Sequence, residues 1–485
     1  MESIAEKSSS WKRSEDKGAM KKPNPLIVVA FAAACALSCT VMPTSKGPRI
    51  AGQGQVFLYL SCSKKPAFDI SFSISGMSFM NKEGAWIDVA LDKRIISAEL
   101  AKNQIKLREF YMPAGRYKRI KWTISEAKVK KNKKSFTLAL PQPKGEHLVD
   151  IEFSVLGRES LCLFADWDPE ESIVDKYLFR PKLNIRKQGA EITSTLVYVT
   201  NTDSDCVTLI DRQRDMVVAT IAVGKAPIGI VATTDGHKLY VANSGSDTIS
   251  VIDTATNMVT NTIRNFGYSP AELALSSDDE TLYATNPDSD NVSVIDTVSC
   301  TVTSRISVGK RPRCILIDED RRKVYVTNTE SHTISVIDIS TQSVENTITV
   351  GLNPTGMLIH EDNLYVANSG SNSIYVLDLP SYTTTKTISV GQKPTWLLSG
   401  LRERVYVSNT NSNQISFVYP DMGLVTRNVS VGALPSKMAM DQLRRKLYVV
   451  NSMSEDVSVI DLPTYNVKRV IQVGRNPHGI ALIEE

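Results

Sequence analysis

Residues 196–485 of the chain repeat one pattern seven times. Each copy has a tyrosine, an asparagine three residues later and a serine three residues after that. Further along it has a glycine, followed three residues later by a proline. The repeated tyrosines are Tyr198, Tyr240, Tyr283, Tyr325, Tyr365, Tyr406 and Tyr448. A unit of about 42 residues cannot bury a hydrophobic face alone, so such units must pack against their neighbours.

Each repeat predicts four short strands. The Val-Tyr-Val and Ile-Ser-Val-Ile segments alternate with period two and are rich in β-branched residues, which is typical of strands. The Asn-x-x-Ser stretch between them predicts a turn, with the asparagine side chain bonded to its own backbone. Glycine and proline separate one unit from the next. Four strands in about 42 residues is the period of a propeller blade.

The pattern resembles the YVTN repeat of surface-layer and periplasmic β-propellers. The resemblance covers residues 196–485 and implies that the strand after each proline lies innermost in its blade. Residues 196–223 lack that strand, whereas the chain ends on an unpaired one, 478–483. We therefore expect an all-β fold with a seven-bladed β-propeller, whose closing blade is shared by residues 196–223 and 477–485.

Residues 1–38 predict an export leader, although residues 1–19 are polar and charged and fit poorly in front of it. Lys21 and Lys22 precede an apolar run that is shorter than the roughly 20 residues needed to span a bilayer. The run ends at Cys39, which resembles the lipidated cysteine of bacterial lipoproteins. That family prefers leucine where this chain has Ala36, so a plain secretory signal stays open. Cys35, which follows three alanines, is a weaker rival for the lipidated cysteine. Translation from Met20 would give a leader of typical proportions.

Lipidation at Cys39 would anchor the protein in the bacterial cell envelope, with residues 39–54 as a tether. Thr40 follows the cysteine, and the aspartate that retains many lipoproteins at the inner membrane is absent. The resemblance therefore implies an outer-membrane location.

Residues 55–187 predict an antiparallel β-sandwich, because short alternating runs are broken by Gly, Asn and Pro. Two stretches resemble a β-sandwich domain of bacterial lipoproteins, which is marked by a PAGxYxxI and a later DFDxxxSI strand. They are PAGRYKRI at 113–120 and DWDPEESI at 166–173. The resemblance implies an architecture and no particular activity.

Three features of the first domain leave alternatives open. Asp166, Asp168, Glu170 and Glu171 either bind calcium or form the wet face of a strand. Cys62 and Cys162 either pair in an oxidising compartment or remain separate buried thiols. Residues 39–195 carry 26 Lys and Arg against 17 Asp and Glu. The basic run within 118–134 either faces anionic lipid headgroups or is simply solvated.

The residue inventory argues against several catalytic classes. The seven cysteines form no CxxC, haem-attachment or zinc pattern, and the five histidines are scattered. Trp396 is the propeller's one tryptophan, whereas tryptophan-derived quinone sites need two. We therefore expect no catalytic residue, metal or cofactor, and a protein that is not an enzyme.

Cationic residues gather in the loops and strand starts that would surround one mouth of the propeller channel. Residues 196–485 hold 24 Lys and Arg against 31 Asp and Glu, so a cationic mouth stands out and favours an anionic ligand. The alternative is that these are solvated loop tips. The predicted ligand-binding residues are Lys310, Arg311, Arg313, Lys393, Trp396, Lys437, Arg475 and His478.

The sequence thus predicts a cell-envelope binding scaffold, held to the membrane by its lipid and binding a protein, an anionic polymer or a small anion at this mouth. Nucleic acid is the least favoured partner, since only Trp396 and Tyr268 offer stacking surfaces. The alternative function is an accessory or catalytic propeller of a periplasmic redox or degradative system.

Overall fold

The computed structural model describes residues 52–483, apart from 63, 65–67, 92–93, 132, 142–144, 190–191 and 193–194. The predicted leader, the start at Met20, the lipidated Cys39 and most of the tether lie outside the described residues. Within them, no helix has the length and apolar character needed to cross a membrane.

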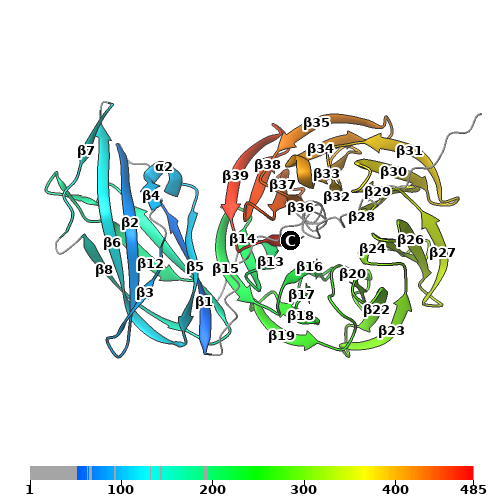
Figure 1. Cartoon of the computed structure of the whole chain (residues 1–485), viewed down its shortest axis with the longest axis horizontal. Coiled ribbons are helices and arrows are strands. Elements are labelled where there is room, and N and C mark those ends of the chain that lie inside the picture. Colours follow the sequence, from blue (N-terminus) through cyan, green and yellow to red (C-terminus); the bar gives the residue numbers. More distant parts are fainter. Residues whose placement is uncertain are drawn as a thin grey trace, which may run out of the picture. The chain divides into compact units, whose positions relative to one another are not determined.

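The first part of the described chain is a β-sandwich (Figure 1). One sheet runs in the order β12 (Lys182–Lys187), β9 (Ser160–Asp168), β1 (Gln53–Ser61) and β5 (Ile105–Pro113). The other has the order β3 (Trp86–Val89), β2 (Asp69–Asn81), β6 (Gly115–Lys131) and β7 (Lys134–Thr137), with β4 (Arg94–Ser97) on β2 and β8 (Glu146–Val155) on β6. A short ladder, β10 (Ile173–Val174) with β11 (Leu178–Phe179), and the single-turn α2 (Ala98–Ala101) complete it.

The sandwich core is aromatic, with Trp122, Trp167, Phe72 and Phe79 all buried. The strand pairs described in the two sheets are antiparallel, as predicted, with one difference: β1 runs parallel to β9. Both faces of β1 are buried, although the sequence predicted one polar face. The second face is covered because Phe57 and Tyr59 pack in a cluster with propeller residues such as Val217.

The two cysteines that were open for pairing are separate buried thiols. Along the parallel ladder Phe57 lies opposite Cys162, whereas Cys62 stands five residues further along the chain from Phe57. At about 3.3 Å per residue this offset exceeds the span of a disulfide. Three of the four acidic residues are also engaged by protein groups. Asp168 pairs with Lys64 at 2.6 Å, Asp166 accepts from the Ser61 hydroxyl, and Glu171 lies 3.8 Å from Lys182.

The rest of the described chain forms seven four-stranded sheets arranged around an axis (Figure 1), and we call each sheet a blade. Blade 1 contains β40 (Pro477–Leu482), β13 (Leu196–Asn201), β14 (Cys206–Asp211) and β15 (Met216–Ala222). Blades 2–7 follow in chain order, each from its innermost to its outermost strand. Blade 2 has β16 (Pro227–Ala232), β17 (Lys238–Asn243), β18 (Thr248–Asp253) and β19 (Met258–Ile263), and blade 3 has β20 (Leu273–Leu275), β21 (Thr281–Asn286), β22 (Asn291–Asp296) and β23 (Thr301–Ser307). Blade 4 has β24 (Pro312–Asp318), β25 (Lys323–Asn328), β26 (Thr333–Asp338) and β27 (Ser343–Thr349), and blade 5 has β28 (Pro354–His360), β29 (Asn363–Asn368), β30 (Ser373–Asp378) and β31 (Thr383–Ser389). Blade 6 has β32 (Pro394–Ser399), β33 (Val405–Asn409), β34 (Gln414–Tyr419) and β35 (Leu424–Ser430), and blade 7 has β36 (Pro435–Asp441), β37 (Lys446–Asn451), β38 (Asp456–Asp461) and β39 (Asn466–Gln472).

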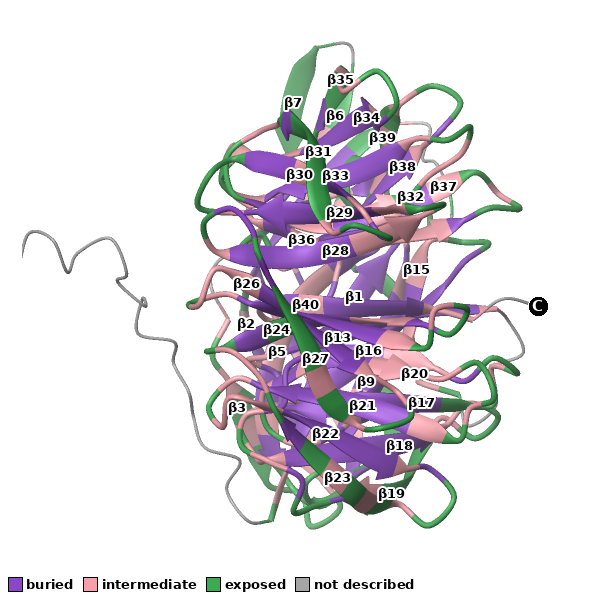
Figure 2. Ribbon diagram, turned by 90° about the vertical axis from the view of Figure 1, so that its right-hand side faces the viewer, coloured by how far each residue is buried: buried purple, intermediate pink, exposed green. Residues whose placement is uncertain are grey.

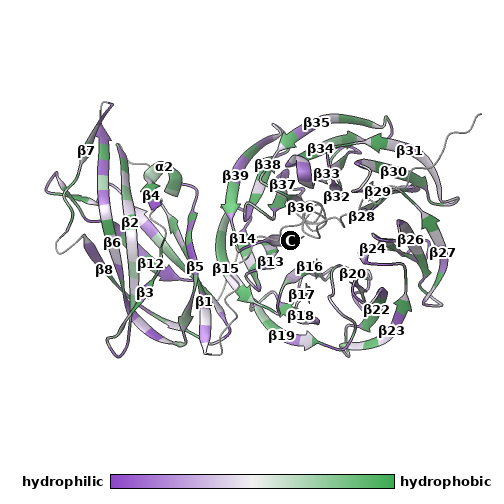
Figure 3. Cartoon of the chain, viewed as in Figure 1, coloured by the Kyte–Doolittle hydropathy of each residue, from purple (hydrophilic) through white to green (hydrophobic). Residues whose placement is uncertain are grey.

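Burial follows position in the blade. The second and third strands are almost wholly buried, whereas an outermost strand such as β27 is largely exposed (Figure 2). The outermost strands are mostly hydrophilic, for example β23, whose sequence TVTSRIS contains two hydrophobic residues (Figure 3). Each blade therefore buries its middle strands against its neighbours, as expected of a repeat unit that is unstable alone.

The ring closes as the sequence predicts. β40 pairs antiparallel with β13, with Ile480 opposite Val199 and Ala481 opposite Tyr198. The innermost strands contact one another in order, and β40 packs against both β16 and β36. A buried ion pair also joins blade 1 to blade 7, because Arg212 contacts Asp441 at 3.0 Å. This closure leaves β13 without an open edge.

The repeated asparagine ties strands together within a blade, and two of the repeated tyrosines bond to the neighbouring blade. In six of the seven repeats the asparagine Nδ2 donates to a hydroxyl seven residues on, at 2.8–3.0 Å, in addition to any bond to its own backbone. The repeated tyrosines are buried. The Tyr198 hydroxyl donates to Asn257 of the next blade, and the Tyr448 hydroxyl of blade 7 donates to Asp215 of blade 1.

Candidate binding site at the propeller mouth

Seven short loops link the outermost strand of one blade to the innermost strand of the next, and we call these the mouth loops. In every mouth loop, the N–H of the residue after the glycine donates to a repeated serine at 2.7–3.0 Å. The next residue has a left-handed φ between 49° and 58°, and in six loops its N–H donates to a side chain of the Asn-x-x-Ser turn.

This bonding explains the acidic residues near the mouth. Asp205, Asp247 and Asp290 each accept a mouth-loop N–H, at 2.7–2.8 Å. Their carboxylates fix the loop backbone, as side chains in Asx-type turns do. The mouth loops therefore hold their cationic side chains on a well-bonded frame.

The innermost strands differ at the second residue after the proline. Three blades have glycine there: Gly229, Gly356 and Gly479. A Cβ at these positions would lie 2.2–2.6 Å from a carbonyl oxygen of the next blade, so the close approach of the strands requires glycine. The other four blades carry Glu272, Cys314, Trp396 and Lys437.

These four larger residues line a pocket of about 160 Å³, which we call the mouth pocket. Five of the eight predicted ligand-binding residues lie in its wall. The other lining residues were not predicted from the sequence. Comparing the second residue after each proline across the repeats would have identified two of them, Glu272 and Cys314. The lining residues are Glu272, Arg313, Cys314, Thr355, Lys393, Thr395, Trp396, Thr410, Leu434, Ser436, Lys437, Ser452 and His478.

A buried ion pair crosses the mouth pocket. The Lys437 Nζ lies 2.5 Å from the Glu272 carboxylate, and the two residues are only 5% and 8% exposed. The same ammonium lies 4.7 Å from the centre of the Trp396 ring, within the range of a cation–π contact. Glu272 therefore neutralises Lys437, and Trp396 covers it.

Arg313 and His478 form a second contact across the ring, with Nη2 and Nε2 3.4 Å apart. Arginine can only donate, so Nε2 of His478 accepts and the proton of the neutral ring belongs on Nδ1. Burial, together with the positive charges of Arg313 and Lys437, holds the pKa of His478 well below its usual range. Desolvation by the surrounding channel wall lowers the pKa of Arg313, although its side chain stays exposed to solvent. An arginine keeps its charge at neutral pH.

Three predicted residues lie outside the mouth pocket. Arg311 and Lys310 are exposed, and Arg311 pairs with Asp288 at 3.2 Å and Glu330 at 3.3 Å. Arg475 contacts Glu109 of the sandwich strand β5 at 3.1 Å. The repeat pattern could not predict this contact, because Glu109 lies in the sandwich domain, outside the repeats.

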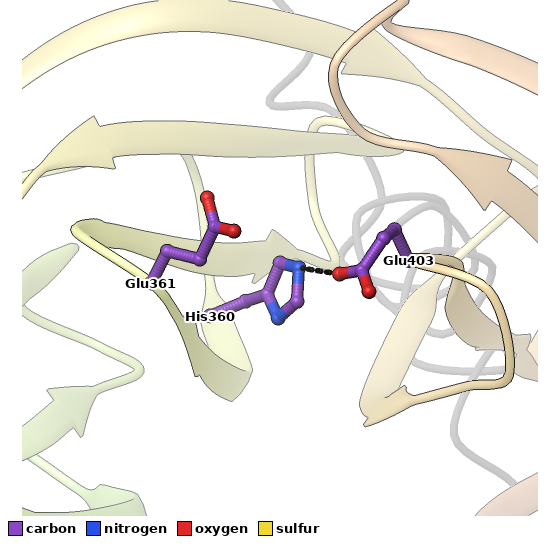
Figure 4. A group of neighbouring side chains, drawn as sticks. All are labelled: His360, Glu361 and Glu403. Atoms are coloured by element: carbon purple, nitrogen blue, oxygen red, sulfur yellow. Dashed lines mark ion pairs between the residues drawn. The ribbon is translucent and has the colours of Figure 1, made fainter.

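The described residues contain one three-residue group with metal-ligand atoms, His360, Glu361 and Glu403, whose atoms lie within 4.8 Å of one another. Figure 4 shows the His360 ring between the two carboxylates. His360 Nε2 lies 3.0 Å from Glu403, and both carboxylates are exposed. An ordinary surface ion pair accounts for this geometry, so we assign no metal to the group.

Residues 188–485 match the family model described as YNCE-like beta-propeller. No curated protein matches the chain. The fold is similar to a protein of unknown function from Desulfotomaculum acetoxidans DSM 771, with TM-score 0.54 and 15% identity over 60% of this chain and 99% of that one. It is also similar to a candidate 6-phosphogluconolactonase of Bacteroides fragilis NCTC 9343, with TM-score 0.51 and 14% identity over 60% and 99%. At these identities the likeness concerns the fold alone.

Proposed function

The chain belongs to the YNCE-like β-propeller family, and we propose that it is a cell-envelope lipoprotein whose propeller binds an anionic ligand at its mouth without transforming it. One observation supports this most strongly. Arg313 and Lys393 face the mouth pocket, and neither has a carboxylate in ion-pair contact among the residues described.

The charges of the pocket wall favour an anion. Arg313, Lys393 and Lys437 contribute three positive charges, and Glu272 contributes one negative charge. The surrounding propeller carries an excess of acidic residues. A concave site with low-dielectric walls strengthens such a local field.

The side chains of the pocket support binding more than catalysis. Burial raises the pKa of the Cys314 thiol to about 12, and a protonated thiol is a poor nucleophile. In the described part of the chain the His478 ring contacts the Arg313 guanidinium, and no carboxylate orients it. An accessory or catalytic role in a redox or degradative system is therefore our second candidate, which activity screens would have to reveal.

We expect the double variant Arg313→Glu/Lys393→Glu to lose binding to whichever anion the wild type binds. The panel should hold small carboxylates, anionic glycans and oligonucleotides, assayed by isothermal titration calorimetry at low and high salt. Wild-type affinity should fall as salt rises. The control is Lys386→Gln on the exposed strand β31. Equal binding by the double variant and the wild type would place the ligand elsewhere.

The membrane anchor rests on Cys39 and is tested separately. We expect Cys39→Ala to leave the membrane pellet and to accumulate without the mature, lipid-modified amino terminus. Cys35→Ala is the matched control, because Cys35 lies in the same leader and should not affect processing. Mass spectrometry of the amino terminus and fractionation check both. A fully processed, membrane-bound Cys39→Ala protein would contradict the anchor.

A further inference from the structure

Two side-chain contacts span the axis of the propeller. Arg313 of blade 4 reaches His478 of blade 1. Lys437 of blade 7 reaches Glu272, which directly precedes β20 of blade 3. In a closed ring of seven sheets, each of these pairs joins blades that lie three positions apart, the greatest separation available. The contacts therefore cross the channel rather than follow its wall.

These contacts lie below the rim of the mouth. Lys393 and Leu434 directly precede their prolines, whereas Arg313 and His478 follow theirs by one residue and Lys437 follows by two. Since an extended strand rises about 3.3 Å per residue, Lys437 lies roughly 7 Å further along its strand than Pro435, the residue that follows Leu434. The crossing contacts thus form the floor of the mouth pocket.

The pocket above this floor is small. Its volume is about 160 Å³. An apolar cavity of about 150 Å³ holds a molecule the size of benzene. The space therefore suits a ligand of about six to eight non-hydrogen atoms, whereas one sugar residue of a polymer already exceeds this.

The charged and apolar residues that line the mouth pocket further limit the kind of ligand it can bind. Lys437 is matched by Glu272, which leaves the pocket lining with a net positive charge from Arg313 and Lys393. These two come from blades 4 and 6, so they approach a ligand from different sides. Trp396 and Leu434 supply an apolar wall for a short carbon chain.

We propose that the mouth pocket binds one compact organic dianion, a short dicarboxylate or a phosphomonoester, and excludes anionic polymers. The inference rests on the proposed function, since it specifies the ligand of the same site. Arg313 and Lys393 each neutralise one negative charge, and the carbon chain lies against Trp396.

The experiment is calorimetric titration of the full-length protein at low salt with four probes. Succinate and ethyl phosphate are the compact dianions, succinamide is the uncharged match of succinate, and a twelve-residue oligothymidylate is the polymer. We expect one of the dianions to bind with 1:1 stoichiometry and succinamide not to bind. Arg313→Gln and Lys393→Gln should each weaken that binding about tenfold or more, since each removes a charged hydrogen bond. Lys386→Gln should leave it unchanged.

The outcomes separate this inference from the function it rests on. If the oligothymidylate or another anionic polymer binds at the mouth and both dianions fail, the compact-ligand inference is overturned while anion binding stands. If no anion of either kind binds, the compact-ligand inference and the proposed anion-binding function are both contradicted. If a dianion binds equally to wild type and to both Gln variants, the ligand occupies another site and the inference is again overturned.

Discussion

Removing residues 477–485 is expected to abolish the cooperative unfolding transition of the propeller. The deletion removes β40, exposes the edge of β13 and withdraws the packing of β40 on both β16 and β36. Burial of one side chain such as Ile480 is worth about 1.5–3 kcal/mol, and a whole domain is stable by only about 5–15 kcal/mol. Thermal and urea unfolding, followed by circular dichroism, would measure the loss.

Two controls make this expectation specific. A synthetic peptide of residues 477–485, added to the truncated protein, should restore part of the transition, because it can occupy the vacant edge of β13. Ile480→Ala in the full chain should lower stability without removing cooperativity, as large-to-small core substitutions do. A truncated protein that melts at the wild-type temperature would contradict the closure.

The sequence predicted the repeat fold and its closure well because both depend on local pattern. Every repeat has the same β-branched strands and ends on the same glycine and proline. The first repeat therefore visibly lacks its innermost strand, and the unpaired strand at the end of the chain could be assigned to it. The pairing of β40 with β13 confirms that reasoning. By contrast, the Arg212–Asp441 pair that reinforces the closure depends on side chains found in single repeats.

The mouth was harder to predict because its contacts cross the ring. Lys437 was grouped with the cations that attract a ligand, yet Glu272, 165 residues away, neutralises it. Arg475 was placed at the mouth for the same reason, and Glu109 of the sandwich engages it. Spacing within one repeat carries no information on a partner in a distant blade or another domain. The sequence did contain one signal for the pocket: four innermost strands carry a larger residue at the position where the other three have glycine.

The buried pair Lys437–Glu272 leads to the second large expected effect. Glu272→Gln should destabilise the propeller by about 3–5 kcal/mol, since it leaves a buried ammonium without its counter-charge. Lys437→Met should cost a similar amount, because it leaves the carboxylate of Glu272 buried and unpaired. Urea unfolding with an unchanged m value would show that stability, and not compactness, has changed.

The double variant Glu272→Gln/Lys437→Met distinguishes a pair from two independent residues. It has no buried charge left, so it should be more stable than either single variant, with a coupling energy of several kcal/mol in a double-mutant cycle. Single variants within about 0.5 kcal/mol of the wild type would mean that water reaches both charges. Additive losses would mean that Lys437 and Glu272 do not interact. If the coupling is found, the floor of the mouth pocket is held by the pair itself, and a ligand above it meets the positive charges of Arg313 and Lys393.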